Sequence, residues 1–590
     1  MNSIDPICGT NVDPETTEYV TDLHGVRHYF CSERCLREYV ESKKIAYFSM
    51  EIGIANDIHT YSGGLGVLAG DTIRTGADLR IPLVAVTLVS RKGYLKQALT
   101  ENGEQIGYPD EWDPSRFMRR LSETVDVRIH GRDVKIGGWH YEQQNPAGGM
   151  VPVIFLDTEL DSNHPDDRTI TDYLYGGDQE YRLKQEIVLG IGGIKMLDAL
   201  DYRIRKYHMN EGHSSLLLLE LLKKNNMSIE NTREKCIFTT HTPVAAAFDI
   251  FPYNRVREMI GDTYPIDSII DYAGPEGLNM TLLALNLSQY INGVTNAHMA
   301  SSRKLFPGFH IRSITNGVYS NLWTSDHYKK VYDIHIPGWA SEPELLVRAE
   351  GIPDVEIWTA HALCKKDLIN YVNDKSGSNM DFDTLTIGFA RRATAYKRAT
   401  LLFSSIERLR EVNRAGKIQL IFAGKAHPND TVGKEMIKEI FNHKKELKDE
   451  IEIAYLENYD MNIAGLLTSG SDVWLGTPMV PYEASGTSGM KAALNGVINF
   501  SVLDGWWIEG CIEGITGWSI GPSPDEYLGE EDRRRRELKD LYSKLEYLII
   551  PKFYENRDWW IDMMKSSISK VTYYFNTNRM MRRYATEAYL

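Results

Sequence analysis

Two segments in the second half of the chain combine basic residues and glycines in a way that suits phosphate binding. In the first, the apolar run TLTIGFA is followed by Arg391, Arg392, Tyr396, Lys397 and Arg398. Cations that follow a buried strand and open a predicted helix would gather near a positive helix end, where phosphate binds. The same cluster, taken alone, also suits a solvated basic face, which is the more common use of such a run.

The second segment, EASGTSGMKAALNG, places Lys491 in a predicted helix directly after a glycine-rich turn. Small residues let backbone N–H groups approach a phosphate, and a lysine held beside such a turn can form an imine. A glycine-rich turn by itself is usually structural, because glycine is found wherever φ must be positive. The turn contains Glu483, Ser485, Gly486, Thr487, Ser488 and Gly489.

The first half of the chain offers a third candidate anion site and two candidate histidines. The turn GGLG contains Gly64 and Leu65 and opens a predicted helix, although its glycines also suit close helix packing. His213 in NEGHSS and His241 in TTHTP each follow a predicted strand. A lone histidine is more often structural than functional, so neither is decisive by itself.

Three of the six cysteines, Cys8, Cys31 and Cys35, lie within the first 35 residues. Their C-x22-C-x3-C spacing supplies thiolates suited to zinc or copper(I), and a segment this short rarely folds without a metal or a disulfide. The other three cysteines stand apart, which favours a metal site over a disulfide framework. No fourth ligand is identified, although His24 and His28 are nearby. Three reduced thiols without a metal are the alternative.

The elements that would position these residues form two series of alternating strands and helices, which predicts an α/β fold. In open α/β sheets ligands bind beyond the carboxyl ends of the strands, where the candidate residues lie. The predicted strands fall within residues 44–53, 81–89, 151–157, 204–210, 235–243, 384–392, 417–424, 452–459, 472–478 and 496–505. We therefore divide the chain into a cysteine-rich module (1–43), two doubly wound halves (44–325 and 326–525) and a C-terminal helical segment (526–590).

The composition excludes some classes of protein. With 590 residues the chain exceeds the size of one core, so several domains are expected. A net charge of −15 argues against general attraction to nucleic acid or to an anionic membrane. No apolar run reaches the roughly 20 residues needed to span a bilayer, and residues 1–20 do not look like a signal peptide. We expect a cytoplasmic protein. The sequence does not decide whether it forms a homo-oligomer.

Taken together, residues 44–525 resemble the α-glucan (glycogen or maltodextrin) phosphorylases, which have the two-domain GT-B architecture with the active site in the cleft between two Rossmann-like domains. The motif order GGLG, HTP, TNG, RR-x3-YKR, AGKA, ENY and EASGT carries the resemblance. It implies that Lys491 binds pyridoxal 5′-phosphate as a Schiff base. The other implied roles are substrate phosphate binding by Arg392 and Lys397, cofactor phosphate binding by Arg391, Thr487, Ser488 and the backbone of Gly64 and Leu65, glucosyl binding by His241, Asn316, Glu483, Ser485 and Gly486, and a cofactor contact by Tyr459.

The resemblance also implies the reaction, a reversible and retaining phosphorolysis of terminal α-1,4-linked glucose that yields glucose 1-phosphate. The cofactor phosphate would exchange a proton with inorganic phosphate, and the main-chain carbonyl of His241 would stabilise the developing positive charge. The sequence departs from long members of the family at Thr394 and Ala395, where those carry His and Glu, and at the cofactor turn, which reads Thr-Ser-Gly rather than Thr-Gly-Asn.

The N-terminal DPICG and YFCSERC segments resemble the YHS family of small metal-binding domains. Two alternatives to a phosphorylase stay open. A GT-B glucan synthase that uses a nucleotide sugar would also suit GGLG and a C-terminal EA-x-G segment, although Lys491 and the RR-x3-YKR cluster favour the phosphorylase. An inactive carbohydrate-binding or metal-sensing regulator would have no reason to retain every proposed cofactor and phosphate contact.

Overall fold

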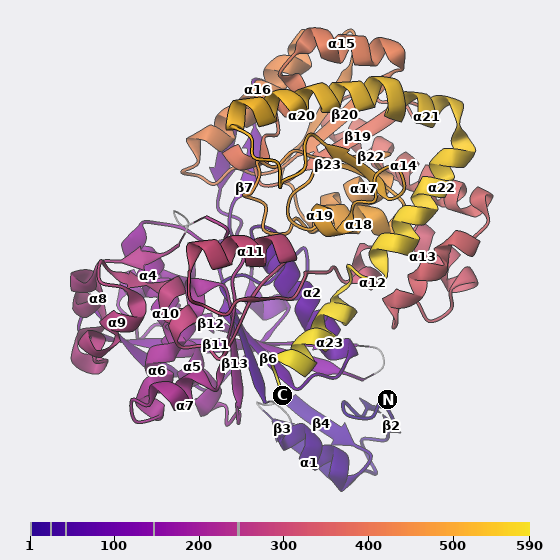
Figure 1. Cartoon of the computed structure of the whole chain (residues 1–590). Helices are drawn as coiled ribbons and strands as arrows, with labels where there is room; N and C mark the ends of the chain where they lie inside the picture. The colour runs from indigo at the N-terminus through magenta and orange to yellow at the C-terminus, as the bar shows by residue number, and fades with distance from the viewer. Residues whose placement is uncertain (1–2, 24–25, 42–43, 146–147, 245–247) are drawn as a thin grey trace.

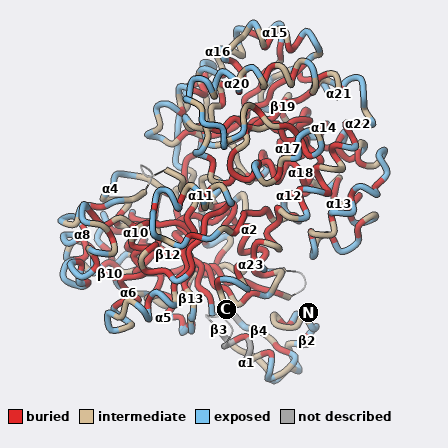
Figure 2. The backbone as a smooth tube through the Cα atoms, in the orientation of Figure 1, coloured by how far each residue is buried: buried red, intermediate tan, exposed pale blue. Residues whose placement is uncertain are grey.

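The computed structural model describes all residues except 1–2, 24–25, 42–43, 146–147 and 245–247. Two β-sheets with covering helices dominate the molecule, and a small N-terminal module lies beside the first of them (Figure 1). We call the part built on the first sheet, residues 45–313, the first half, and the part built on the second sheet, residues 385–520, the second half. Buried residues are concentrated along both sheets (Figure 2). No helix in the described ranges is long and apolar enough to cross a membrane.

The first sheet has ten strands, with a parallel centre and an antiparallel edge. Two of its central strands are buried along their whole length and are mostly apolar, because both of their faces are covered. The spatial order is β10 (Val125–Ile129), β11 (Arg132–Gln144), β12 (Met150–Asp157), β6 (Leu83–Leu88), β5 (Ile45–Ser49), β13 (Lys206–Asn210), β14 (Cys236–Thr239), β17 (Tyr290–Gly293) and β18 (Arg312–Ser313), with β9 (Arg119–Arg120) beside β11. Every strand predicted before residue 250 is confirmed.

Helices surround this sheet, and the glycine-rich turn does open one of them, as predicted. One long helical stretch consists of α4 and α5 joined by a π-turn. The helices are α2 (Gly64–Asp78), α3 (Pro165–Arg168), α4 (Gln179–Ile187), α5 (Gly193–Ala199), α6 (Leu217–Lys224), α7 (Ile229–Arg233), α8 (Tyr253–Ile260), α9 (Ile270–Ala273), α10 (Met280–Asn286) and α11 (Asn296–Leu305). A short β-pair, β15 (Ile250–Phe251) and β16 (Leu278–Asn279), completes this half.

The second sheet has six strands, all parallel. Five of them are the predicted ones, and the edge strand β24 is an addition that the apolar runs do not predict. The order is β21 (Glu452–Leu456), β20 (Ile418–Ala423), β19 (Leu385–Ala390), β22 (Val473–Gly476), β23 (Ile498–Val502) and β24 (Gly517–Ile520). Its helices are α12 (Ser320–Trp323), α13 (Asp326–His335), α14 (Asp354–Ser376), α15 (Ile406–Ala415), α16 (Thr431–Glu446), α17 (Met461–Gly470), α18 (Ser488–Leu494) and α19 (Trp507–Gly510).

The C-terminal segment is helical, as predicted, but it does not stay with one half. α20 (Glu530–Lys544), α21 (Ile550–Glu555) and α22 (Arg557–Ser567) pack on the second half. The chain then returns, and α23 (Thr577–Glu587) packs on the first half beside α2 (Figure 1). Tyr584 in α23 lies near Thr239 at the end of β14, with 3.1 Å between their hydroxyl oxygens. The last helix therefore ties the end of the chain to the first sheet.

Hydrogen bonds join the two halves where loops follow the strands. The hairpin of β7 (Lys96–Leu99) and β8 (Gln105–Tyr108) leaves the first half and reaches the second (Figure 1). There Gln97 Nε2 donates to the carbonyl of Gly424 at 2.9 Å. The Thr295 hydroxyl, before α11, donates to the carbonyl of Ala484 in the glycine-rich turn at 2.8 Å. These contacts hold the loops of the second half against the first.

The N-terminal module consists of β1 (Ser3–Ile4), β2 (Asn11–Val12), β3 (Tyr19–Leu23), β4 (Val26–Phe30) and α1 (Glu33–Glu41). Its small core contains Phe30, Cys35 and Tyr39, and it packs on Met150 at the start of β12. Arg80, just beyond the end of α2, donates to the carbonyl of Ile7 at 2.8 Å. The module thus adjoins the end of α2 that lies opposite Gly64.

Candidate functional site

The N-terminus of α2 carries the GGLG turn and already faces a carboxylate. Glu51 Oε2 accepts hydrogen bonds from the backbone N–H groups of Ser62 at 2.6 Å and Gly63 at 3.2 Å. Its other oxygen accepts from the Tyr175 hydroxyl at 2.9 Å. A Cβ at Gly66 would lie 2.6 Å from Glu51 Oε2, so this position must be glycine for the carboxylate to approach. The turn can therefore bind an anion. Gly64 and Leu65 directly follow Ser62 and Gly63, whose backbone N–H groups donate to Glu51.

The predicted helix at residues 396–398 is not present. The segment Ala395–Lys397 forms a short 3-10 turn, and Arg398 has a left-handed backbone with φ of 48°. The Arg398 guanidinium points to Glu537 in α20, with 2.6 Å between Nη1 and Oε2. Arg398 is therefore a structural cation, and no α-helix end contributes to the anion site within this described segment.

Arg392 is the exposed member of this basic cluster. Its guanidinium makes no hydrogen bond or ion pair within the described part of the chain, so it is available to a ligand. Burial raises the pKa of Tyr94 to about 12, and the charge of Arg392 opposes that rise. Burial also raises the pKa of Tyr175, which Arg392 again opposes. Arg392 thus lies near first-half side chains, including the tyrosine that binds Glu51.

Glu483 connects the basic cluster to the glycine-rich turn. Its carboxylate forms ion pairs with Lys397 and with Arg391, the latter at 3.4 Å, and all three side chains are largely buried. The backbone N–H of Glu483 donates to Asp504 Oδ2 at 2.9 Å. Burial, reinforced by the neighbouring Glu483 charge, raises the pKa of Asp504 to about 7. Two carboxyl groups and two basic side chains therefore share one small volume at this turn.

The glycine-rich turn leads into α18 and Lys491, as the sequence predicts. Gly486 has φ of +80°, which explains its glycine, and Thr487 immediately precedes the helix. Ser488 Oγ accepts from the indole N–H of Trp474 at 3.1 Å, whereas Ser485 Oγ is buried without a partner among the described residues. Burial lowers the pKa of Lys491 to about 8. Its Nζ lies 3.4 Å from the centre of the Trp323 ring.

His241 and Asn316 meet in the first half. Both line a cavity of about 10 Å³, roughly the volume that one water molecule needs. His241 Nε2 lies 2.7 Å from Asn210 Oδ1, and its backbone N–H donates to Glu211 Oε2 at 2.6 Å. Burial lowers the pKa of His241 to about 3, so its ring is neutral over the ordinary range of pH. Glu211 has φ of +74°, a strained backbone for this residue type.

The structure brings Arg391, Lys397 and Glu483 together, and Tyr459 lies near Arg391. Burial raises the pKa of Tyr459, which the Arg391 charge opposes. His213, in contrast, contacts Asp249, with 3.7 Å between its Nε2 and Oδ2 of that residue. Burial lowers the pKa of His213 to about 3. Glu483 with its basic partners therefore forms one group and His241 with Asn316 another, while the Lys491 amine packs on the Trp323 ring.

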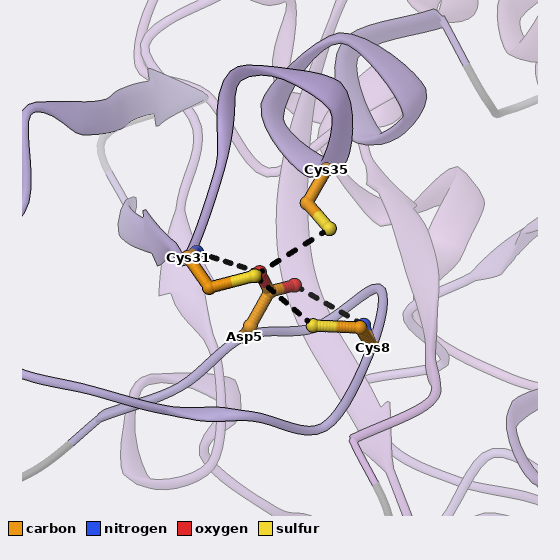
Figure 3. A group of neighbouring side chains, drawn as sticks. All are labelled: Asp5, Cys8, Cys31 and Cys35. Atoms are coloured by element: carbon orange, nitrogen blue, oxygen red, sulfur yellow. Dashed lines mark hydrogen bonds between the residues drawn. The ribbon is translucent and has the colours of Figure 1, made fainter.

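The three clustered cysteines also come together, with a fourth residue that the sequence does not single out (Figure 3). One ligand atom each from Asp5, Cys8, Cys31 and Cys35 lies within 4.8 Å of the others. The Cys8 and Cys31 sulfurs are 3.3 Å apart, and those of Cys31 and Cys35 are 3.8 Å apart. The Asp5 carboxylate accepts from the backbone N–H groups of Ile7 at 2.8 Å and Cys31 at 2.8 Å.

Neither predicted histidine neighbour completes this cluster in the described residues. His24 lies outside them. The His28 ring contacts the Tyr39 hydroxyl at 3.1 Å and Glu142 at 3.5 Å, so it belongs to the contact with the first half. The D-P-x-C pattern is the signal that would have identified Asp5, since an aspartate before proline commonly caps a turn. For Glu51, Glu211 and Asp504 the only sequence signal is their place after a strand.

Comparisons with known proteins concern the family of the chain as a whole. The family model described as carbohydrate phosphorylase matches residues 256–514. The chain is 38% identical to a maltodextrin phosphorylase of Thermococcus litoralis, over 92% of this chain and 70% of that protein. It is 34% identical to a glycogen phosphorylase of Aquifex aeolicus, over 93% of this chain and 86% of that protein. An uncharacterized protein of Methanocaldococcus jannaschii is 30% identical over 93% of this chain and its own full length. The chain belongs to the carbohydrate phosphorylase family.

Proposed function

We propose that the protein is an α-glucan phosphorylase that transfers the terminal α-1,4-linked glucose of glycogen or maltodextrin to inorganic phosphate, giving glucose 1-phosphate. One observation carries this proposal: Glu483 joins Arg391 and Lys397 to the turn that leads into Lys491. A candidate phosphate-binding cluster and a candidate cofactor lysine thus flank the same turn. We further propose that the two halves form a GT-B architecture whose active site lies between them, since loops of both halves reach these residues.

The residues around Lys491 fit pyridoxal phosphate. Within the described ranges the Lys491 amine makes no hydrogen bond or ion pair, so it is available for covalent attachment. Two buried polar atoms of the same motifs, Arg391 Nε and Ser485 Oγ, also lack partners among the described residues. We assign attachment to Lys491. Phosphate contacts are assigned to Arg391, Thr487, Ser488 and the backbone at Gly64, with Tyr459 beside the cofactor.

The reaction then needs a second phosphate and a glucosyl unit. When bound, pyridoxal phosphate supplies a phosphate group that can exchange a proton with inorganic phosphate. We assign inorganic phosphate to Arg392 and Lys397, because Arg392 is exposed and makes no ion pair with the described residues, while Lys397 belongs to the same basic cluster. Such charge-assisted contacts hold the anion in place.

We assign the sugar to residues from both groups of candidates. We assign its hydroxyls to Glu483, Ser485, Gly486, Asn316 and Leu65, and the positive charge that develops at its reacting carbon to the main-chain carbonyl of His241. The Glu211 carboxylate fixes that backbone from the N–H side. Because phosphate would enter on the face that the glucan leaves, retention would follow without a carboxylate nucleophile, unlike the two-carboxylate glycosidases.

Phosphate release from glucose 1-phosphate, with short maltodextrins as acceptors, tests this function. A phosphorylase releases phosphate and lengthens the acceptor. The alternative synthase would lengthen the acceptor only from a nucleotide sugar, and an inactive regulator would do neither. A cytoplasmic location stays a prediction, as does the absence of nucleic-acid and membrane partners, and the oligomeric state stays open.

We also propose that the N-terminal module binds zinc or copper(I) through Cys8, Cys31 and Cys35. Burial opposes ionisation of Asp5, but the N–H donors of Cys31 and Ile7 outweigh it and its pKa is lowered. Asp5 is the candidate fourth ligand, since a carboxylate offers about four acceptor positions and only three are used by backbone N–H groups. Metal content per chain, measured by elemental mass spectrometry after purification without added chelator, tests the assignment.

A further inference from the structure

The carboxylate of Asp71 lies buried in the middle of α2, against the edge of the Trp323 indole. Its exposed fraction is 1%. Trp323 Nε1 donates to Oδ2 at 2.8 Å, and the backbone N–H of Tyr319 donates to the same oxygen at 3.1 Å. Arg74 Nη1 donates to Oδ1 at 3.3 Å. Burial raises the pKa of Asp71, and the charges of Arg74 and Lys491 oppose that rise. Because these three partners are all donors, they suit the ionised form of the carboxyl group.

The same indole carries Lys491 on its face. The Lys491 Nζ lies 3.4 Å from the ring centre while the ring N–H is bonded to Asp71. A cation over a tryptophan face is attracted by the ring, and more strongly where water is excluded. Trp323 is 3% and Lys491 6% exposed, so water is largely excluded here. One side chain therefore links the carboxylate of the first half to the amine of the second.

We propose that Asp71 and Trp323 are positioning residues that hold the Lys491 amine for cofactor attachment and set the pH at which it becomes reactive. The inference rests on the proposed function, in which Lys491 is the cofactor lysine. In the attachment the ammonium first loses one proton, and the freed electron pair attacks the aldehyde carbon of pyridoxal phosphate. A C=N bond replaces the C=O bond, and the oxygen leaves as water. The protein must therefore hold the amine in place without keeping it protonated.

The charges around Lys491 act in opposite directions on this step. Burial lowers the pKa of the amine, Asp71 raises it and Arg74 lowers it. Removing the Asp71 charge takes away the attraction that favours the ammonium and leaves the Arg74 charge without its partner. Both changes shift Lys491 towards the neutral amine. Asp71→Asn should therefore lower the pH midpoint of attachment by about one unit. Well below the midpoint, attachment should then be about tenfold faster than in the wild type.

The experiment measures attachment itself and not turnover. Cofactor-free full-length protein is mixed with pyridoxal phosphate at a series of pH values, trapped with borohydride after fixed times, and the modified Lys491 peptide is quantified by mass spectrometry. Asp71→Asn is compared with Trp323→Phe, which keeps a ring face but loses the N–H bond to Asp71. Asp78→Asn is the matched control, since Asp78 lies on the same helix and bonds to Asn145.

We expect a lower midpoint in Asp71→Asn and slower attachment at every pH in Trp323→Phe, with Asp78→Asn unchanged. A residue that only supported the fold would reduce the amount trapped without moving the midpoint. Coincident midpoints in wild type and Asp71→Asn, together with unchanged rates in Trp323→Phe, would overturn this inference and leave the proposed function intact. If the wild-type protein attaches no pyridoxal phosphate at Lys491 at any pH, the proposed function itself fails. Should Asp71→Asn not fold, Trp323→Phe decides by its rate of attachment per folded protein, with the folded amount checked by circular dichroism.

Discussion

The two candidate sites of this protein are built in opposite ways. Around Glu483, side chains 86 and 92 positions away in sequence are held by packed strands and buried ion pairs. First-half residues such as Asp71 lie close to the neighbouring Lys491. Around Asp5, four residues within one short module meet on two turns and the start of a helix. The first site is supported by the core of the whole protein. The second has a core of only a few buried side chains.

This difference has an energetic consequence. A buried framework can hold charged groups in place before any ligand arrives. Anion binding and catalysis both need such preorganised groups. A module of about forty residues buries too little apolar surface to do so, and metal binding would then supply part of its folding free energy. We expect the first site to depend on individual side chains and the second on its ligand.

The largest effect is expected for Lys491→Ala. The variant should lose covalently attached pyridoxal phosphate, about one per chain in the wild type, and with it all measurable phosphorolysis. The buried framework should nevertheless survive, because the lysine makes no hydrogen bond or ion pair within the described ranges. Mass spectrometry after denaturation measures the cofactor, and circular dichroism checks the fold. A wild-type protein without the cofactor would contradict the assignment.

The next effect concerns the phosphate cluster. Arg392→Ala should reduce kcat/KM for inorganic phosphate by about a hundredfold, because a charge-assisted contact contributes about 1.5–3 kcal/mol. Lys397→Ala should reduce it at least as much, since it also leaves Glu483 with only the weaker partner Arg391. Glucan binding, measured separately, should change far less in Arg392→Ala.

Arg398→Ala is the control for this cluster, because Arg398 pairs with Glu537 and points away from the site. It should lower the stability of the fold more than it lowers phosphate use. If phosphate kinetics were unchanged in both Arg392→Ala and Lys397→Ala, the anion site would have to lie elsewhere.

A smaller effect is expected on the stability of the fold at acidic pH. Burial lowers the pKa values of His208, His213 and His241 to about 3, below the roughly 6.5 of an exposed histidine. The folded state therefore binds fewer protons than the unfolded state between these values. Stability is fully present above pH 6.5 and falls as the pH drops below it, by at most about 1.4 kcal/mol per pH unit for each histidine.

Denaturant unfolding at pH 7 and pH 5 measures this loss. His208→Gln should flatten the dependence on pH, whereas His164→Gln, at an exposed position, should not. Added zinc should not restore the stability of the first half at pH 5. The acid response of the first half can thereby be told apart from that of the module. Equal pH dependence in His208→Gln and the wild type would show that His208 is not buried in its neutral form.

The sequence predicts most strands because continuous apolar runs are typical of parallel strands covered on both faces. It also identifies Arg392 as a candidate by its place after a strand, and Lys491 by the glycine-rich turn that precedes its helix. It fails at Arg398, since the pattern of a strand followed by basic residues does not reveal that the chain forms a 3-10 turn and that Glu537 draws this arginine away. Asp71 is also missed, because a polar residue within a helix gives no sign of the indole that bonds to it from 252 positions away.

The smallest effect on turnover is expected for the double substitution Cys31→Ser and Cys35→Ser. It should abolish metal binding, because only Cys8 would remain of three thiolates, while phosphorolysis stays within about twofold of the wild type. The module adjoins α2 through Arg80, and α2 has 15 residues, which is about 22 Å from the turn at Gly64. Loss of order in the module should not reach that turn. Cys511→Ser, outside the module, is the matched control and should keep both properties. Loss of nearly all turnover in the double variant, with pyridoxal phosphate still bound, would show instead that the module acts on the active site, and the two sites would then no longer be independent.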